Sequence, residues 1–366
     1  MCGVRIAVAG AGLIGRRHVR LIQESGSCDL SAIVDPAPGA ADFAREAGVP
    51  IYPTLTGLFA TERPDGVIVA TPNSLHVENG LECVEHGVPV LVEKPISDSV
   101  EEALRLAEAA EAASVPLLVG HHRRHSPILA KACEIVEDGT LGPIVAVMGS
   151  ALFYKPDHYF DEGPWRREVG GGPILINMIH EVDDLRSLCG EIVAVQAFSS
   201  SATRGFPVED TVAINLRFAK GTLGTFLLSD TAASARSWEQ TSQENASYPH
   251  YPDEDCYLIA GTRGSLAVPT MRLKVYTGER SWWKPFHEDV IGVDRADPLA
   301  RQLEHLCSVI RGASHPLVTG RDGVQTLRVT LAIHEAAQTE RPVHLPLTEN
   351  TAVTADKEVG SSEVRR

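Results

Sequence analysis

No stretch of the 366-residue sequence approaches the roughly 18 consecutive apolar residues that a membrane-spanning helix requires. The first residues lack the basic segment, apolar run and small-residue cleavage site of a secretory signal. The seven cysteines are scattered and include no C-x-x-C pair, so neither a disulfide scaffold nor a zinc ribbon is expected. These absences predict a cytoplasmic protein that has no membrane partner.

Basic residues are fewer than acidic ones. The chain has 33 Lys and Arg and 48 Asp and Glu, which gives a formal net charge of −15. This balance argues against a nucleic-acid partner, since nucleic-acid binding depends on basic side chains that neutralise phosphates. Hydrophobic residues make up 43% of the chain and charged residues 22%, which is ordinary globular usage and excludes bulk disorder. The length suggests two domains.

The first 120 residues alternate short apolar runs with helix-like stretches, which predicts an α/β domain built on a doubly wound parallel sheet. The runs are apolar throughout, as expected of strands buried on both faces. The predicted strands are 4–9, 30–35, 66–71, 89–93 and 116–120, and the predicted helices are 14–24, 40–47, 74–86 and 99–113. Residues 1–122 are therefore predicted to form an N-terminal Rossmann domain.

Beyond residue 120 the pattern changes to long strands with one buried face. In the run TVAINLRF, for example, Val212, Ile214 and Leu216 alternate with Thr211 and other residues that face the opposite way. The predicted strands are 144–153, 193–200, 211–218 and 222–229, and the predicted helices are 172–188, 297–311 and 321–339. We expect residues 123–347 to form a second domain, whose last helix can pack back on the first, and residues 348–366 to be a disordered tail. An uncovered apolar sheet face predicts a homodimer or homotetramer.

A glycine-rich turn follows the first strand and opens a helix. It reads Gly10-Ala11-Gly12-Leu13-Ile14-Gly15, the G-x-G-x-x-G pattern of a dinucleotide-binding loop. Asp35 ends the next strand 20 residues after Gly15, where a carboxylate accepts hydrogen bonds from the ribose of NAD and repels the 2′-phosphate of NADP. The sequence therefore predicts NAD rather than NADP as the cofactor.

Further motifs are similar to those of one known family. They are the segment Ala70-Thr71-Pro72-Asn73-Ser74-Leu75-His76, the triplet Glu93-Lys94-Pro95, the pair Arg123-Arg124 closing the strand near residue 120, and the glycines at 170–172 before a helix that carries His180 and Asp183. Together they resemble the Gfo/Idh/MocA oxidoreductase family. The resemblance implies a Rossmann domain followed by an α/β domain with a large, mostly antiparallel open sheet, which often serves as an oligomer interface. It also implies NAD(P)-dependent oxidation of a ring hydroxyl of a sugar or cyclitol, or reduction of the ketone, without a catalytic metal.

The resemblance assigns catalysis to Lys94 and His180. The Lys94 ammonium suits donation to the reacting oxygen, and the His180 imidazole suits proton transfer near neutral pH. The family pattern places an aspartate four residues before this histidine, but Ile176 occupies that position here and Asn177 follows it. Lys94 is therefore expected to carry more of the proton transfer, or Asn177 to bind a substrate hydroxyl.

The predicted binding residues come from the motifs and the resemblance together. The cofactor set is Gly10, Gly12, Leu13, Ile14, Gly15, Asp35, Thr71, Pro72, Asn73, His76, Glu93, Lys94, Trp165 and Arg166, and the substrate set is Lys94, His122, Tyr154, Arg167, Asn177 and His180. If residues 121–125 form a strand, His121 and His125 face one way and His122 the other, and no neighbouring cysteine or carboxylate completes a metal site.

Two alternatives to the sugar or cyclitol dehydrogenase stay open. Arg167 and Lys155 together suit a carboxylate, which would make the substrate a sugar acid or a cis-dihydrodiol carboxylate. The other alternative is an NAD-binding regulator without turnover, against which the presence of both Lys94 and His180 argues. The polar loop 238–255 is either a flap over the site or an ordinary surface loop.

Overall fold

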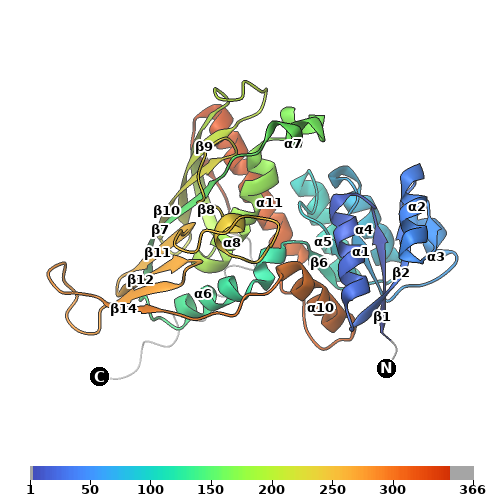
Figure 1. The fold of residues 1–366 in the computed structure, drawn as a ribbon, viewed down its shortest axis with the longest axis horizontal. Coiled ribbons are helices and arrows are strands. Elements are labelled where there is room, and N and C mark those ends of the chain that lie inside the picture. The colour runs from blue at the N-terminus through green and yellow to red at the C-terminus, as the bar shows by residue number, and fades with distance from the viewer. Residues whose placement is uncertain (1–2, 347–366) are drawn as a thin grey trace. The chain divides into compact units, whose positions relative to one another are not determined.

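The computed structural model describes residues 3–346, which form two compact units (Figure 1). The first unit extends to Pro127 and takes in Ala296–Arg328, and the second contains Ile128–Arg295 and the chain from Val329 onward. Where the sequence predicted a change of domain at residue 122, the first unit continues to Pro127 and includes the later segment Ala296–Arg328. The returning segment carries α10 (Pro298–Ile310), whose Leu303, Leu306 and Cys307 are buried in the core of the first unit. The predicted tail, 348–366, lies outside the described residues.

The first unit is built on a six-stranded parallel sheet with the order β3-β2-β1-β4-β5-β6. This is the strand order of a Rossmann fold, so the predicted fold class is confirmed. Its strands are β1 (Val4–Ala9), β2 (Cys28–Val34), β3 (Ile51–Tyr52), β4 (Gly66–Val69), β5 (Val90–Val92) and β6 (Leu117–Val119). Its helices are α1 (Leu13–Glu24), α2 (Pro38–Ala47), α3 (Leu55–Phe59), η1 (Asn73–Leu75), α4 (His76–Glu85), α5 (Val100–Ala113), η2 (His122–His125), α10 and the start of α11 (Gly320–Thr339).

The second unit is built on a nine-stranded sheet with the order β14-β13-β12-β11-β7-β10-β9-β8-β15. Within this sheet, as far as residues 3–346 describe it, only the β7–β10 pair is parallel, which confirms the predicted mostly antiparallel sheet. Its strands are β7 (Ile144–Leu152), β8 (Ile192–Ser200), β9 (Thr211–Phe218), β10 (Leu223–Ser229), β11 (Tyr257–Gly261), β12 (Gly264–Val268), β13 (Arg272–Val275), β14 (His287–Val290) and β15 (Val343–His344). Its helices and turns are α6 (Pro127–Glu137), α7 (Asp157–Asp161), η3 (Pro164–Arg167), the π-helical turn η4 (Ile174–Met178), α8 (Ile179–Cys189), α9 (Trp238–Thr241) and the end of α11.

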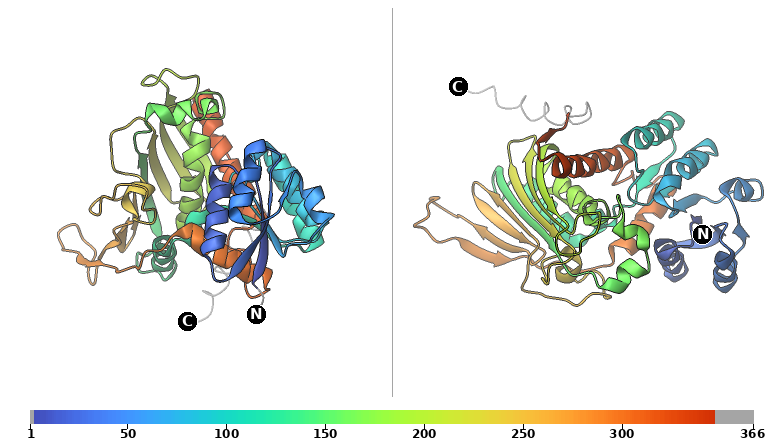
Figure 2. Two further views of the ribbon diagram at one scale, coloured as in Figure 1. Left: turned by 45° about the vertical axis from the view of Figure 1, so that its right-hand side comes forward. Right: turned by 90° about the horizontal axis from the view of Figure 1, so that it is seen from above.

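The core of the second unit lies on one face of this sheet. Helix α8 and the end of α11 cover that face, as Figure 2 shows, and Val182, Leu185 and Ile333 pack there with the strands. The inward residues of β9 alternate with exposed ones as the sequence predicts. The opposite face leaves large apolar side chains in solvent, among them Met148, which is 52% exposed, and Phe198, which is 56% exposed.

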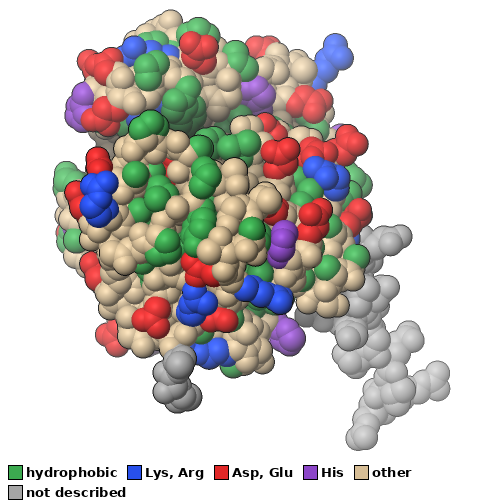
Figure 3. Space-filling view, turned by 90° about the vertical axis from the view of Figure 1, so that its right-hand side faces the viewer, with side chains coloured by type: hydrophobic (Ala, Val, Ile, Leu, Met, Phe, Trp, Pro, Cys, Tyr) green, Lys and Arg blue, Asp and Glu red, His purple; other side chains and the backbone are tan. Residues whose placement is uncertain are grey.

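Charged side chains are dispersed on the face of the molecule that Figure 3 shows, where Lys and Arg occur in small groups among Asp and Glu. The helices within residues 3–346 include none that is long and apolar enough to cross a membrane.

Candidate functional site

The glycine-rich loop of the first unit connects β1 to α1 and leaves room for a ligand against the backbone. Gly10 has a φ of 98°, and a Cβ atom there would lie 2.4 Å from the Ala70 carbonyl oxygen. A Cβ atom on Gly15 would lie 1.9 Å from the carbonyl oxygen of Gly10, so the helix packs against the turn only with glycine. At Gly12, by contrast, a Cβ atom would meet no described atom within 4 Å. This open side and the free first-turn N–H groups of α1, which no described side chain caps, fit a pyrophosphate.

Asp35 lies at the edge of this loop and is held there by backbone donors. Its Oδ2 accepts a hydrogen bond of 2.7 Å from the N–H of Ala11, and its Oδ1 accepts one of 2.8 Å from the N–H of Ala37. Each carboxylate oxygen keeps a second lone pair that a ribose hydroxyl can use. The geometry therefore fits the ribose-binding role that the sequence predicts for Asp35. Leu13, a second predicted cofactor residue in the same loop, is 88% exposed.

His76 connects two loops at the carboxyl ends of β4 and β5. Its Nε2 lies 2.8 Å from the Thr71 carbonyl oxygen and its Nδ1 lies 2.7 Å from the Pro95 carbonyl oxygen. A neutral imidazole can donate to only one of these acceptors. Because both ring nitrogens face the backbone, His76 holds the loops together, whereas Pro72 and Asn73 beside it are exposed. Its direct contact with the cofactor stays a prediction.

Glu93 is the buried acid immediately before Lys94. Its Oε1 lies 2.7 Å from the Nε2 atom of His18 in α1, and its Oε2 accepts a hydrogen bond of 3.2 Å from the backbone N–H of Lys94. Burial opposes ionisation of this carboxyl. The hydrogen bond from His18 and the electrostatic influence of His18, His122 and Lys94 outweigh burial and hold the pKa of Glu93 below its usual value.

The segment 121–125 is not a strand, so the expected alternation of its histidines is wrong. Strand β6 already ends at Val119, and His122–His125 form the 3-10 turn η2, which also contains Arg123 and Arg124. The Nε2 atom of His125 lies 2.9 Å from the Nδ1 atom of His305 in α10. Burial lowers the pKa of His125 to about 3, which keeps this imidazole neutral. His122 remains near Glu93, which it influences electrostatically.

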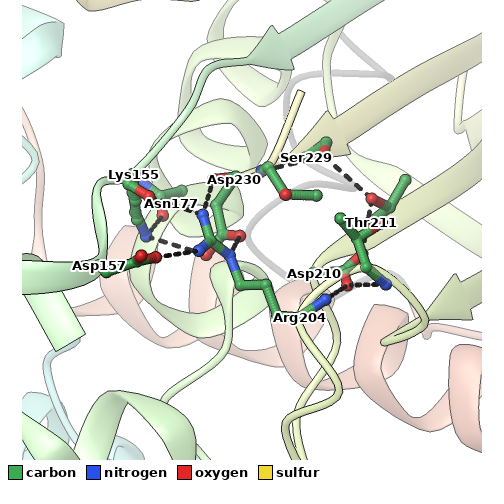
Figure 4. A network of polar contacts seen from close by, with 10 residues as sticks. Lys155, Asp157, Asn177, Arg204, Asp210, Thr211, Ser229 and Asp230 are labelled. Atoms are coloured by element: carbon green, nitrogen blue, oxygen red, sulfur yellow. Dashed lines mark hydrogen bonds and ion pairs between the residues drawn. The ribbon is translucent and has the colours of Figure 1, made fainter. Parts of the chain in front are cut away.

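The second unit gathers a polar cluster at the ends of β7, β10 and the π-helical turn (Figure 4). The Nζ atom of Lys155 donates to Oδ1 of Asn177 over 2.7 Å and lies 3.7 Å from Oδ2 of Asp230. Arg204 donates from Nε to Oδ1 of Asp230 over 2.9 Å and from Nη2 to the Lys155 carbonyl oxygen. The side chains of Lys155, Arg204 and Asp230 are only 11%, 7% and 4% exposed, so the two cations and the carboxylate are largely shielded from solvent.

His180 lies in the first turn of α8 and is 9% exposed, and Asp183 on the next turn is 1% exposed. The predicted helix 172–188 is confirmed over most of its length, but it opens with the π-helical turn η4, which the sequence did not predict. Glu209 binds this opening, because its Oε1 accepts a hydrogen bond of 3.0 Å from the N–H of Ile174. Burial raises the pKa of Glu209. Turns of this kind are frequent at functional sites.

The loop after β7 contributes a cavity of about 440 Å³ within the second unit. It is lined by Tyr154, Asp157, Phe160, Arg167, Thr203, Arg204, Phe206 and Thr231. Arg167 forms an ion pair with Asp161, and its guanidinium lies 5.4 Å from the Phe206 ring centre. Tyr154 and Arg167, two predicted substrate residues, therefore meet at one cavity.

Trp165 and Arg166, the predicted cofactor contacts of this unit, both lie in η3. Trp165 is 56% exposed. The Arg166 guanidinium lies 3.9 Å from the Tyr159 ring centre, and Arg166 also donates to the carbonyl oxygen of Tyr159. Arg166 thus connects η3 to Tyr159. Contact of Trp165 or Arg166 with the cofactor stays a prediction.

Sequence reasoning missed His18, Arg204 and Asp230. Asp230 follows directly on β10, and a charged residue at the end of a strand with one buried face was a usable signal. Arg204 lies in a loop between β8 and β9, and His18 occurs in an ordinary helical stretch. Only the fold brings these two side chains to their partners. The loop 238–255 begins with Trp238, which is 3% exposed and donates to Glu244, so its first part is anchored in the core.

Comparison with known proteins shows the family. Residues 4–121 match the family model described as "Oxidoreductase family, NAD-binding Rossmann fold", and residues 129–267 match the "GFO/IDH/MocA C-terminal domain". The chain is 30% identical over 339 residues to 1,5-anhydro-D-fructose reductase of Ensifer adhaerens, which covers 92% of this chain and 96% of the relative. It is 28% identical over 357 residues to scyllo-inositol 2-dehydrogenase (NAD(+)) of Bacillus subtilis, which covers 93% of this chain and 96% of the relative.

Among solved structures, the WlbA dehydrogenase from Bordetella pertussis, in complex with NADH and UDP-GlcNAcA, is similar with a TM-score of 0.76 and 25% identity. The likeness covers 94% of this chain and all of that one. The loop geometry at Gly10–Gly15, the fixed Asp35 and these matches agree that the cofactor is NAD. The chain therefore belongs to the Gfo/Idh/MocA family of NAD-binding oxidoreductases.

Proposed function

We propose that this enzyme is a dehydrogenase that oxidises a ring hydroxyl of a neutral sugar or cyclitol, or reduces the corresponding ketone. The cluster of Lys155, Asn177, Arg204 and Asp230 carries the proposal. The two largely buried cations in it, Lys155 and Arg204, already interact with a carboxylate or an amide oxygen, so the cluster offers directed hydrogen bonds rather than an uncompensated charge. Such sites suit hydroxyl groups, and the named relatives act on an anhydro sugar and an inositol.

The proton chemistry is assigned to Lys94 and His180. When bound, NAD supplies the nicotinamide that accepts a hydride from the carbinol carbon. The Lys94 ammonium donates a hydrogen bond to the reacting oxygen and stabilises the charge that develops there. His180 accepts the hydroxyl proton, since an imidazole is suited to this task near neutral pH. Asn177, fixed through Oδ1 by Lys155, keeps its amide N–H groups for a substrate hydroxyl.

A carboxylated ring is the second candidate substrate, because Arg167 lines the cavity together with Tyr154. The ion pair between Arg167 and Asp161 argues for the neutral substrate, since a carboxylate would have to compete with Asp161. A regulator without turnover is the third candidate. It keeps the NAD site but would show no hydride transfer with any substrate.

Activity with a substrate panel separates these candidates. Purified protein is mixed with NAD or NADP and with inositols, aldoses, anhydro sugars and matched sugar acids, and formation of reduced cofactor is followed by absorbance. We expect turnover with NAD and a neutral ring substrate. A sugar acid oxidised with a higher kcat/KM than its neutral counterpart would favour the second candidate. NAD binding without turnover across the panel would favour the regulator.

Assembly and location remain predictions. A homodimer or homotetramer is supported by the apolar side chains on the open face of the second unit's sheet. The cytoplasmic location is supported by the scattered cysteines of the sequence.

A further inference from the structure

His18 is a buried histidine for which the proposed chemistry has no role. It lies in α1, three residues beyond the glycine-rich loop, and is 2% exposed. Its Nε2 atom lies 2.7 Å from Oε1 of Glu93. Its Nδ1 atom is buried and has no hydrogen-bond partner among residues 3–346, so a proton there would have no acceptor. The imidazole therefore presents a single N–H donor, directed at Glu93.

The other side of the Glu93 carboxylate is fixed as well. Oε2 accepts the backbone N–H of Lys94 over 3.2 Å, and the backbone N–H of Glu93 donates to the Val69 carbonyl oxygen over 2.9 Å. Gly120 leaves the space that this carboxylate occupies, because a Cβ atom there would lie 2.8 Å from Oε2. One carboxylate thus links α1 to the peptide group of Lys94.

We propose that His18 is a positioning residue for catalysis, which orients the Glu93 carboxylate so that it holds the Lys94 backbone and keeps a negative charge next to Lys94. This inference rests on the proposed function, in which Lys94 donates to the reacting oxygen. The groups that influence Glu93 come from three places: His18 from α1, His122 from η2, and Lys94 itself.

Loss of His18 has a defined electrostatic consequence. A buried carboxylate that loses a side-chain hydrogen-bond donor shifts toward its protonated, neutral form. The negative charge that stabilises the nearby Lys94 ammonium is then lost, so the ammonium gives up its proton at lower pH. Activity that depends on the ammonium should therefore decline at lower pH than in the wild type.

The experiment compares His18→Leu, which removes the donor, with His18→Gln, which keeps an N–H donor at similar reach. We expect His18→Leu to lower kcat about 10- to 100-fold, as a small misplacement of a reacting group does. NAD affinity, measured by fluorescence titration, should change little. In the plot of kcat against pH, the decline on the high-pH side should move to lower pH. His18→Gln should restore most of kcat, and its kcat should decline at the same high pH as in the wild type. His86→Leu is the matched control, because His86 is an exposed histidine directly after α4, with its Nδ1 atom 2.8 Å from the Glu82 carbonyl oxygen and its ring stacked on Phe59.

Two further variants keep the inference falsifiable. Glu93→Gln preserves the size of the side chain and removes its charge, so it should shift the high-pH limb in the same direction even if His18→Leu does not fold. A wild-type pH profile in folded Glu93→Gln, or wild-type kcat in folded His18→Leu, would overturn the positioning role. Full activity in Lys94→Ala would instead contradict the proposed function, whatever the His18 variants show.

Discussion

Lys94 is the residue on which the proposed chemistry depends most, because its ammonium is the proposed donor to the reacting oxygen. We expect Lys94→Ala to lower kcat by about 10²- to 10⁴-fold, with NAD affinity little changed. Steady-state kinetics and a fluorescence titration of the cofactor measure the two quantities separately. Lost NAD binding in this variant would make Lys94 a binding residue rather than a catalytic one.

His180 should matter less than Lys94. Because Ile176 stands where the family pattern has an aspartate, His180→Ala is expected to lower kcat by a smaller factor than Lys94→Ala. If both side chains serve one proton transfer, the double variant should be little slower than Lys94→Ala alone. Fully multiplicative losses in kcat would mean that the two residues act in separate steps.

Asp35 is predicted to determine the choice between the two nicotinamide cofactors. Asp35→Ala removes the acceptor for the ribose hydroxyls and the negative charge that repels a 2′-phosphate. NAD should bind more weakly and the preference over NADP should shrink, as measured by kcat/KM with each cofactor. Asp42→Ala, on the exposed side of α2, is the control. A wild-type enzyme with higher kcat/KM for NADP would refute the assignment.

At the scale of elements, Asp230 joins the end of β10 to the loop after β7 and to Arg204. Asp230→Ala would remove the buried carboxylate that contacts two largely buried cations, and breaking a buried ion pair typically costs about 3–5 kcal/mol. The free energy of unfolding from urea denaturation should fall accordingly. Asp157→Ala is the control, because its side chain is 89% exposed and lies 3.9 Å from Arg204. Equal stability of the two variants would contradict this account.

The elements also show where sequence patterns succeed. Strand β1 was predicted with its observed bounds, because its apolar run is uninterrupted and the glycine turn ends it. Strand β3 was missed because it is only two residues long and has no periodicity to detect. The turn η2 was taken for strand because a short basic run carries no helical period.

At the scale of the molecule, the open sheet face predicts self-association. Met148 lies opposite Leu258, and Leu227 and Phe198 both lie opposite Ala213, so the exposed apolar side chains form continuous rows. Light scattering at micromolar concentration should give a mass of two or four times 39.4 kDa. Leu227→Lys should reduce this mass, and Leu317→Lys, in the first unit, should not. A wild-type mass near 39.4 kDa would refute the prediction.

The sequence alone determined the features that depend on local chain geometry. The glycine spacing at Gly10–Gly15 and the carboxylate of Asp35 mark a dinucleotide loop wherever they occur between a strand and a helix. The alternation of apolar and polar side chains along β9 likewise indicates which face of the strand is buried. Only the tertiary structure decided the contacts between distant segments. His18 meets Glu93 across 75 positions, and Arg204 meets Asp230 from a separate loop. The reason is physical: strand and helix periods follow from neighbouring residues, whereas the partner of a buried charge depends on how the whole chain packs.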